Sequence, residues 1–119
     1  ITAFTAISTR NWNADLALYS QAAQKLQDQD IPNNEIVIAS NPALFSNLSD
    51  HPSIAIPSES PSKIIELARV FGVRYVIFDT KHCREANRDL CDGTAPHALF
   101  STVGEFGTLR VLRISTNNP

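Results

Sequence analysis

Hydrophobic residues recur at helical spacing in the first quarter of the chain, with polar residues between them. The apolar stripe consists of Leu16, Tyr19, Ala23 and Leu26. This spacing predicts an amphipathic helix from about residue 13 to residue 29. Asn11 or Asn13 can cap its start, because an asparagine side chain accepts a hydrogen bond from a free N–H of the first turn. The polar, proline-containing segment 30–34 ends the helix.

Three short apolar runs follow, at residues 35–40, 53–56 and 73–79, and the first shows no period-two alternation and the third shows little. Such runs are typical of strands that are buried on both faces, as in a parallel sheet. Between them we predict a short helix or turn at 43–48 and a helix that runs to Phe71. Each begins with a polar residue and a proline, Asn41-Pro42 and Ser60-Pro61, because proline suits the first position of a helix.

The second of these helices has a clear apolar face. Its members are Ile64, Ile65, Leu67, Ala68 and Phe71. Gly72 follows, where a left-handed stop is expected. Two further runs, 98–106 and 109–114, flank Gly107-Thr108 and predict a hairpin. Val111 and Leu112 are adjacent and both apolar, so either both faces of this hairpin are covered or a bulge interrupts it.

Right-handed crossovers make the first three strands a parallel sheet with helices packed on it. We expect the strand order 2-1-3, with the hairpin added antiparallel beyond the third strand. The sequence therefore predicts an α/β fold: a small three-layer domain with a parallel βαβαβ core, preceded by a helix and extended by a C-terminal hairpin. The 119 residues form one domain, 1–119. A net charge of -2 gives no broad basic surface for nucleic acid, so no nucleic-acid partner is expected.

Cys83 and Cys91 lie in a polar loop, 80–97, and suggest a local disulfide. Closing so short a loop contributes about 2.5 kcal/mol in the chain-entropy description. Free thiols are the second interpretation, and a zinc site that borrows His82 and His97 is the third. A disulfide implies an oxidising, extracytoplasmic compartment.

Few residues suggest chemistry. The first strand-to-helix turn, Ser40-Asn41-Pro42, has no glycine to cradle a phosphate, so no cofactor is predicted. His51, His82 and His97 lie in predicted loops without an informative partner, and we interpret them as solvated.

Asp79-Thr80 ends the central strand, at the edge where open α/β sheets bind ligands. Ser40 and Asn41 end the neighbouring strand, and Glu59 is the one possible acidic companion. These five residues are the candidate ligand-facing group. The alternative is that Asp79 caps its loop or pairs with Lys81 or Arg84.

Residues 13–115 also carry an order of motifs that resembles a known family. Ser40-Asn41-Pro42, then Ile56-Pro57, then a helix closing on residues 72–76 resemble the C-terminal extracytoplasmic domain of GT-C type membrane glycosyltransferases. These are similar to the dolichyl-phosphate-mannose–protein mannosyltransferases and the aminoarabinose transferases. The cysteine-containing loop departs from the pattern of that family.

The resemblance implies a domain attached to a transmembrane region of the same polypeptide, on the extracytoplasmic face of a membrane. Residues 1–12 would be the linker, consistent with an opening that lacks an initiator Met and a signal segment. The family uses a polyprenyl-phosphate-linked sugar, and its catalytic acids lie outside this region, so no catalytic residue and no metal ligand is carried over. Lipid-linked sugar or acceptor would be possible partners.

Three functions remain as alternatives. The first is a non-catalytic accessory domain of such an enzyme that helps to shape its acceptor site. The second is a free-standing small α/β domain that binds a ligand or hydrolyses a substrate at the Asp79 end of the sheet. The third is a protein-interaction module that uses the hairpin as an open edge.

Overall fold

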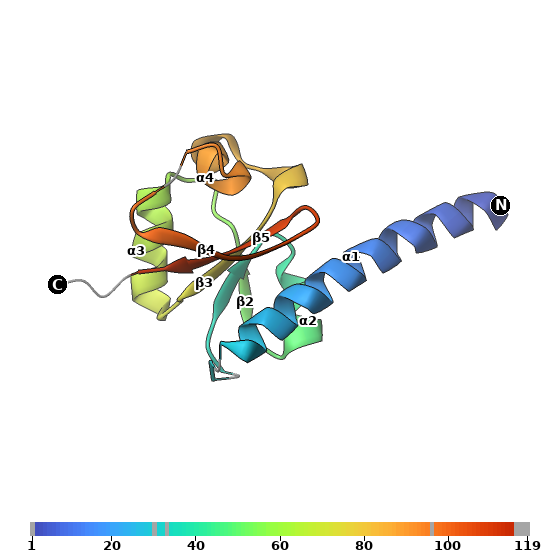
Figure 1. Cartoon of the computed structure of the whole chain (residues 1–119), viewed down its shortest axis with the longest axis horizontal. Helices are drawn as coiled ribbons and strands as arrows, with labels where there is room; N and C mark the ends of the chain where they lie inside the picture. The colour runs from blue at the N-terminus through green and yellow to red at the C-terminus, as the bar shows by residue number, and fades with distance from the viewer. Residues whose placement is uncertain (1, 30, 33, 96, 116–119) are drawn as a thin grey trace.

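The computed structural model describes residues 2–29, 31–32, 34–95 and 97–115, with side chains from Ala14 onward within those ranges. At its centre is a five-stranded sheet of order β2-β1-β3-β5-β4 (Figure 1). The strands are β1 (Val37–Ala39), β2 (Ser53–Ala55), β3 (Tyr75–Asp79), β4 (Phe100–Phe106) and β5 (Leu109–Ile114). The predicted α/β class, the 2-1-3 order of the first three strands and the place of the hairpin are confirmed.

The parallel half of the sheet is short and deeply buried. β1 pairs with β2 on one side and with β3 on the other, and Ile38 is the partner of Val76. All side chains of β1 and β3 are buried, which is why neither run alternates in polarity. β2 forms one edge of the sheet and lies between Pro52 and Pro57.

Two explanations were open for the adjacent apolar residues in the hairpin, coverage of both faces or a bulge, and the structure contains both. Val111 and Leu112 are both buried, on opposite faces of β5, so both faces are covered. A bulge is present as well, because the pairing of β4 with β5 shifts between Thr102 and Gly104. The extra residue lies on β4, at the outer edge of the sheet.

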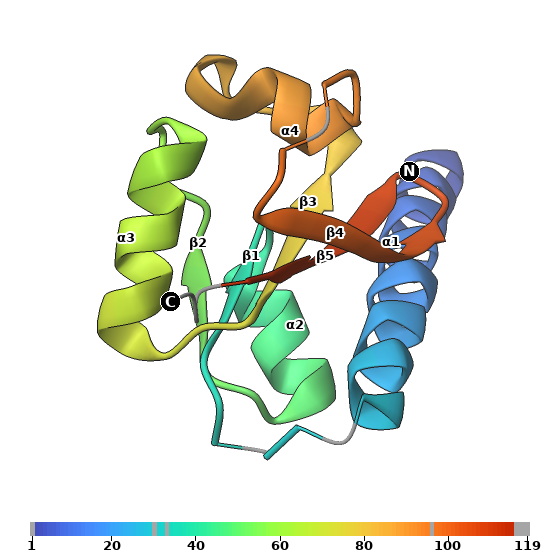
Figure 2. The same ribbon diagram turned by 60° about the vertical axis from the view of Figure 1, so that its left-hand side comes forward.

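Helices cover both faces of the sheet and make the three predicted layers (Figure 2). α1 (Thr2–Asp28) and α2 (Pro42–Ser49) cover one face, and α3 (Pro61–Phe71) and α4 (Arg88–Asp92) cover the other. The side chains of β3 alternate between the two cores. Val76 and Phe78 face α3 and α4, whereas Tyr75 and Ile77 face α1 and α2.

The helix ends follow the sequence signals in most respects. The Asn41 side chain accepts from the backbone N–H of Leu44, and Gly72 adopts a left-handed conformation with φ of 70°. Ser60 precedes Pro61 as predicted, but its hydroxyl makes no capping hydrogen bond. Phe71, expected in the core, is 49% exposed, because the chain turns at Gly72 and Val73 fills the core there instead.

Helix α1 begins at Thr2, eleven residues before the predicted start. Asn11 and Asn13 therefore lie inside the helix and neither caps it. No glycine or proline occurs before Pro32, so nothing in the backbone stops the helix from extending toward the N-terminus. Its first part projects away from the sheet (Figure 1). The side chains of residues 1–13 lie outside the described part of the chain.

The predicted apolar stripe of α1 is nearly correct. Tyr19, Ala22 and Leu26 are buried, and Ala23 is only partly so. Among the described helices, none combines the length and the hydropathy that crossing a bilayer requires. Of the break predicted at 30–34, residues 30 and 33 lie outside the described part.

The segment 80–97, predicted as a polar loop, is more ordered than its composition indicates. It contains two short 3-10 turns, η1 (Thr80–His82) and η2 (Glu85–Asn87), and then α4. Leu90 and Cys91 are buried against the sheet. The only apolar residues of α4 are Leu90 and Cys91, which are too few to produce a visible periodicity, so the sequence does not predict this helix.

A substitution at the hairpin turn tests the packing of the sheet on α1. Gly107 has a φ of 59°, and a Cβ there would lie 2.8 Å from Leu18 Cδ2. We expect Gly107→Ala to lower the free energy of unfolding by about 2–3 kcal/mol, from left-handed strain and overpacking together. Gly72→Ala is the matched control. It has a φ of 70° but no atom within 4 Å of the added Cβ, so it should cost about 1 kcal/mol. Equal losses in urea unfolding would contradict this packing.

Candidate functional site

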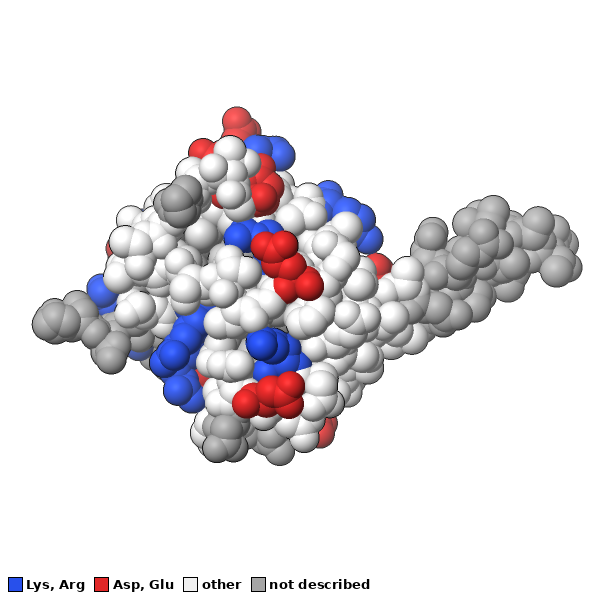
Figure 3. Space-filling model, in the orientation of Figure 1, with Lys and Arg blue, Asp and Glu red and all other residues white. Residues whose placement is uncertain are grey.

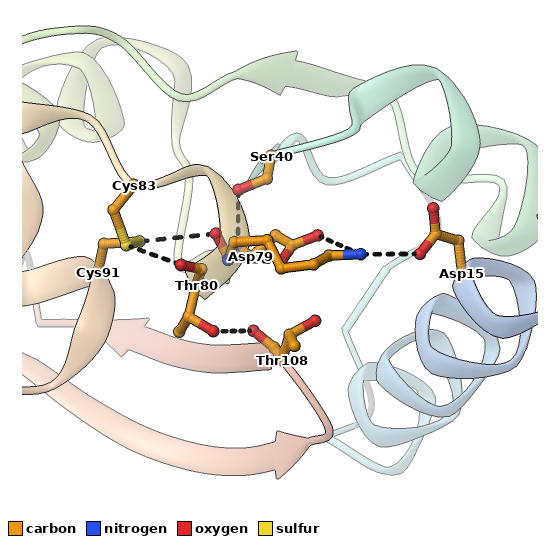
Figure 4. A network of polar contacts seen from close by, with 8 residues as sticks. Asp15, Ser40, Asp79, Thr80, Cys83, Cys91 and Thr108 are labelled. Carbon is orange, nitrogen blue, oxygen red and sulfur yellow. Dashed lines mark hydrogen bonds and ion pairs between the residues drawn. A yellow bond between two sulfur atoms is a disulfide. The ribbon is translucent and has the colours of Figure 1, made fainter. Parts of the chain in front are cut away.

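The carboxyl edge of the sheet brings together four of the five predicted residues. Ser40 follows β1 and Asp79 ends the adjacent β3, and the backbone N–H of Asp79 donates to Ser40 Oγ at 2.8 Å (Figure 4). Asp79 is only 5% exposed, and its Oδ1 accepts from the backbone N–H of Lys81 at 3.0 Å. Asp79 thus caps the 3-10 turn η1, which is the alternative that the sequence left open.

Lys81 supplies a positive charge at this edge. Its Nζ lies 3.4 Å from Asp15 Oδ1 and 4.0 Å from Asp79 Oδ2, so it bridges α1 and the end of β3. Of the two cations that the sequence offered as partners for Asp79, the structure thus pairs it with Lys81. Because Lys81 is about half exposed, we expect each of these ion pairs to contribute less than about 1 kcal/mol.

The other predicted residues at this edge also have partners within the protein. Thr80 donates its backbone N–H and its hydroxyl to the carbonyl of Thr108, at 2.8 and 3.1 Å. Asn41 caps α2. The Thr80 bonds hold the β3–η1 turn against the hairpin, whereas the Asn41 bond stabilises the first turn of α2.

Glu59 stands apart from the other four. Its side chain is exposed. Its backbone carbonyl accepts a hydrogen bond from Asn87 Nδ2 at 2.8 Å. Asn87 also donates to the carbonyl of Pro57 and is 2% exposed. The described residues contain no group of three or more His, Cys, Asp or Glu side chains placed to hold a metal ion.

Cys83 and Cys91 form a disulfide, as predicted, with an S–S distance of 2.08 Å and a Cα–Cα distance of 5.7 Å. The sulfurs of Cys83 and Cys91 lie 3.7 and 3.8 Å from the carbonyl oxygens of Thr80 and Asp79. These are van der Waals contacts rather than hydrogen bonds, since disulfide sulfur carries no hydrogen.

Arg110 on β5 holds the other side of the disulfide segment. Its Nη1 donates to the carbonyls of Leu90 and Cys91 at 2.7 and 3.2 Å, at the end of α4. Its Nη2 donates to Thr102 on β4 at 3.0 Å. A cation that bonds the last carbonyls of a helix complements the partial negative charge there. The guanidinium therefore ties the disulfide segment to the hairpin.

Tyr19 is the unusual member of the carboxyl edge. It is 2% exposed, and among the described residues its hydroxyl has no hydrogen-bond partner. Burial raises the pKa of the phenol well above its usual range, and the carboxylates of Asp79 and Asp15 raise it further. The backbone N–H of Asn41 acts in the opposite direction, but falls short of hydrogen-bond geometry. The sequence identified Tyr19 only as part of an apolar stripe.

A second polar region lies at the opposite edge, where β1, β2 and β3 begin. A cavity of about 440 Å³ opens there between α1 and α2. Its lining residues are Ser20, Ala23, Gln24, Gln27, Ile31, Leu48, Ser49, Asp50 and His51. His51 is 4% exposed, so the interpretation of this residue as solvated was wrong.

Long-range contacts bury and orient His51. Its Nδ1 lies 3.1 Å from the carbonyl of Glu35, and its ring stacks on Phe45 with centroids 6.3 Å apart. Its backbone N–H donates to Ser49 Oγ, and its carbonyl accepts from Ser53 Oγ. His82 is exposed and His97 is half-buried.

Charges alternate in sign over the surface that Figure 3 displays. Basic and acidic side chains of the described residues lie beside one another there, and these residues form no extended basic surface on that face. Comparisons of the chain with known proteins found no matching family model, no matching curated protein and no matching solved structure.

The buried phenol of Tyr19 should make stability fall at alkaline pH. Its folded pKa is raised above the unfolded value of about 10, so the folded state keeps the proton that the unfolded state releases. This contribution is complete below about pH 10 and is lost as the pH rises further. Tyr19→Phe should therefore flatten the loss in unfolding free energy between pH 9 and pH 11, and should be at least as stable as the wild type at neutral pH, since the hydroxyl has no partner.

Tyr75→Phe is the control for the Tyr19 experiment. The Tyr75 hydroxyl lies 3.4 Å from Gln29 Oε1 and belongs to the opposite end of β3. This variant removes the other tyrosine of the chain, so an alkaline loss that Tyr19→Phe flattens and Tyr75→Phe does not is assigned to the Tyr19 phenol. The same pH dependence in Tyr19→Phe and in the wild type would contradict the assignment.

Reduction of the disulfide should lower stability without changing the fold. We expect the reduced chain to lose about 2.5 kcal/mol of unfolding free energy, because the unfolded state regains the entropy of an open loop. Urea unfolding with and without dithiothreitol measures this difference. The double variant Cys83→Ala/Cys91→Ala should unfold at the same urea concentration with and without the reductant.

Proposed function

We propose that the chain is a non-catalytic extracytoplasmic domain of a membrane glycosyltransferase that uses a polyprenyl-phosphate-linked sugar, and that it helps to shape the acceptor site. The observation that carries the proposal is the engagement of the carboxyl edge. Asp79, Ser40, Thr80 and Asn41 bond to the backbone of the protein or to one another. A ligand at this edge would have to displace those contacts.

The arrangement of α1 is consistent with attachment to a membrane region of the same polypeptide. Its first part projects beyond the sheet, and its C-terminal half packs on the core through Tyr19, Ala22 and Leu26 (Figure 1). A helix that packs on the core at its C-terminal end can hold the domain at a fixed distance from the membrane region that precedes it. Residues 1–12 would be that connection, and from Thr2 onward they belong to α1.

The disulfide supports the proposed compartment. It is partly buried, it closes a segment next to the central strand, and such bonds persist in oxidising environments. The alternative of a free-standing ligand-binding or hydrolytic domain at Asp79 has less support. One oxygen of the Asp79 carboxylate accepts from the N–H of Lys81 and the other faces the Lys81 ammonium.

Detection of the native protein in its cells tests the attachment. An antibody raised against residues 14–115 should detect a polypeptide much larger than the 13.1 kDa of this chain. We expect this polypeptide to stay with the membranes in alkaline carbonate and to dissolve only in detergent. A protease that cannot cross the membrane should remove the epitope from intact cells. A band near 13 kDa in the carbonate-soluble fraction would contradict the proposal.

A substitution in that membrane protein tests the non-catalytic role. Asp79→Asn keeps an acceptor for the N–H of Lys81 and removes the charge, so sugar transfer from a polyprenyl-phosphate donor should stay within about twofold of the wild type. Glu59→Gln removes an exposed charge near the same edge and is the matched control. A hundredfold loss in Asp79→Asn alone, with normal amounts of protein in the membrane, would assign catalysis to this edge.

A further inference from the structure

The cavity between α1 and α2 contains a histidine nitrogen that the fold does not use. The carbonyl of Glu35 can only accept, so Nδ1 of the neutral His51 ring carries the proton and Nε2 carries a lone pair. No described residue bonds Nε2. His51 is 4% exposed and is one of the residues that line the cavity, so this acceptor belongs to a buried polar residue of the cavity wall, and Nε2 is not among its fully buried polar atoms.

The backbone holds His51 in this position at a conformational cost. Asp50, the residue before it, is the one described non-glycine residue with positive φ, at 64°. Such a conformation is unfavourable by about 1 kcal/mol or more for a residue with a side chain. The hydrogen bond from the N–H of Asp50 to Ser46 and the stacking of His51 on Phe45 maintain it. The turn therefore fixes the imidazole rather than letting it sample solvent.

The polar groups of the cavity form a mixed set of acceptors and donors. Besides His51 Nε2, the acceptors include the Asp50 carboxylate and the side-chain amide oxygen of Gln24. The amide nitrogen of Gln24 already donates to Asp28. The Ser20 hydroxyl and the Gln27 amide can both donate and accept. Ala23, Ile31 and Leu48 supply apolar surface between them.

This set selects among classes of small ligand. An anion would face the Asp50 carboxylate and a lone pair, and none of the lining residues is Lys or Arg. An ammonium group has donors only, so it could bond to the acceptor atoms of Ser20 and Gln27 but would offer no acceptor to the Gln27 amide N–H groups or the Ser20 hydroxyl hydrogen. A hydroxyl both donates and accepts, so several hydroxyls on one carbon frame can match every group, with the C–H face against the apolar residues.

We propose that this cavity binds a small neutral polyhydroxylated ligand of saccharide size, with a ligand hydroxyl donating to His51 Nε2. The volume of about 440 Å³ lies within the range of small-molecule sites. The site goes beyond the function proposed above, which assigns the domain no ligand of its own. It lies at the amino edge of the sheet, away from Asp79.

A titration of the isotope-labelled chain tests the site. The probes are glucose, mannose and maltose at millimolar concentrations, with inorganic phosphate and ethanolammonium as the anionic and cationic comparisons. We expect at least one sugar to shift, in a saturable manner, the His51 Nε2 resonance and the side-chain amide signals of Gln24 and Gln27. Phosphate and ethanolammonium should give no saturable shift of these signals.

Two variants separate the ligand contact from the fold. In His51→Asn the amide nitrogen can replace Nδ1 as donor to Glu35, but nothing replaces Nε2, so binding should weaken by about tenfold or more. Ala23→Leu leaves His51 intact and fills part of the cavity, with a similar loss expected. His82→Asn, which changes an exposed histidine on the far edge, is the matched control and should bind like the wild type.

Three results would overturn the proposal. They are the absence of saturable shifts with all three sugars, equal shifts with phosphate or ethanolammonium, and wild-type affinity in folded His51→Asn. The experiment uses the chain alone, so its failure leaves the result of the membrane-fractionation experiment unaffected. In the same way, finding a carbonate-soluble 13 kDa protein would contradict the membrane attachment but would not contradict sugar binding in the cavity.

Discussion

Strand β3 lies at the centre of the sheet, between β1 and β5, and all five of its side chains are buried. A strand in this position needs an apolar layer on each face, because its side chains point alternately to the two sides. Val76 and Phe78 reach one layer, and Tyr75 and Ile77 reach the other. The helices, the hairpin and the polar contacts at the two ends of the strand all follow from this burial.

The fifth residue of β3 is an aspartate, and its burial sets the chemistry of the carboxyl edge. A buried carboxylate is costly unless donors surround it. Asp79 therefore takes the N–H of Lys81 and lies near the Lys81 ammonium, while its own N–H goes to Ser40. Polar residues that resemble a ligand site in the sequence can thus be the groups whose hydrogen bonds compensate for burying a charged strand end. The disulfide and Arg110 then close the segment that leaves this edge.

Much of the fold could be predicted because its signals are local. Asn41-Pro42 and Gly72 mark helix ends through their own backbone preferences, and the absence of alternation in 73–79 reports burial on both faces. The errors concern properties that depend on distant contacts. Phe71 is exposed because Val73 takes its place in the core, and Cys91 is buried because β3 and β5 lie beneath it.

The candidate site shows the same division. The meeting of Ser40 and Asp79 follows from the parallel topology and was predictable. The burial of His51 depends on the Glu35 carbonyl, sixteen residues away, and on the ring of Phe45, and neither leaves a mark in the sequence around it. The positive φ of Asp50 was equally hidden, because aspartate tolerates many conformations.

The two outer strands have a consequence for the behaviour of the protein at high concentration. An unpaired strand edge can template pairing with another molecule, which is a common route to aggregation. Here β2 is only three residues long and has a proline on either side, Pro52 and Pro57, and the bulge next to Thr102 breaks the regular repeat of β4. Both flanks of the sheet therefore hinder the addition of a strand from a neighbouring copy, and this favours the dispersed protein over fibrous assemblies.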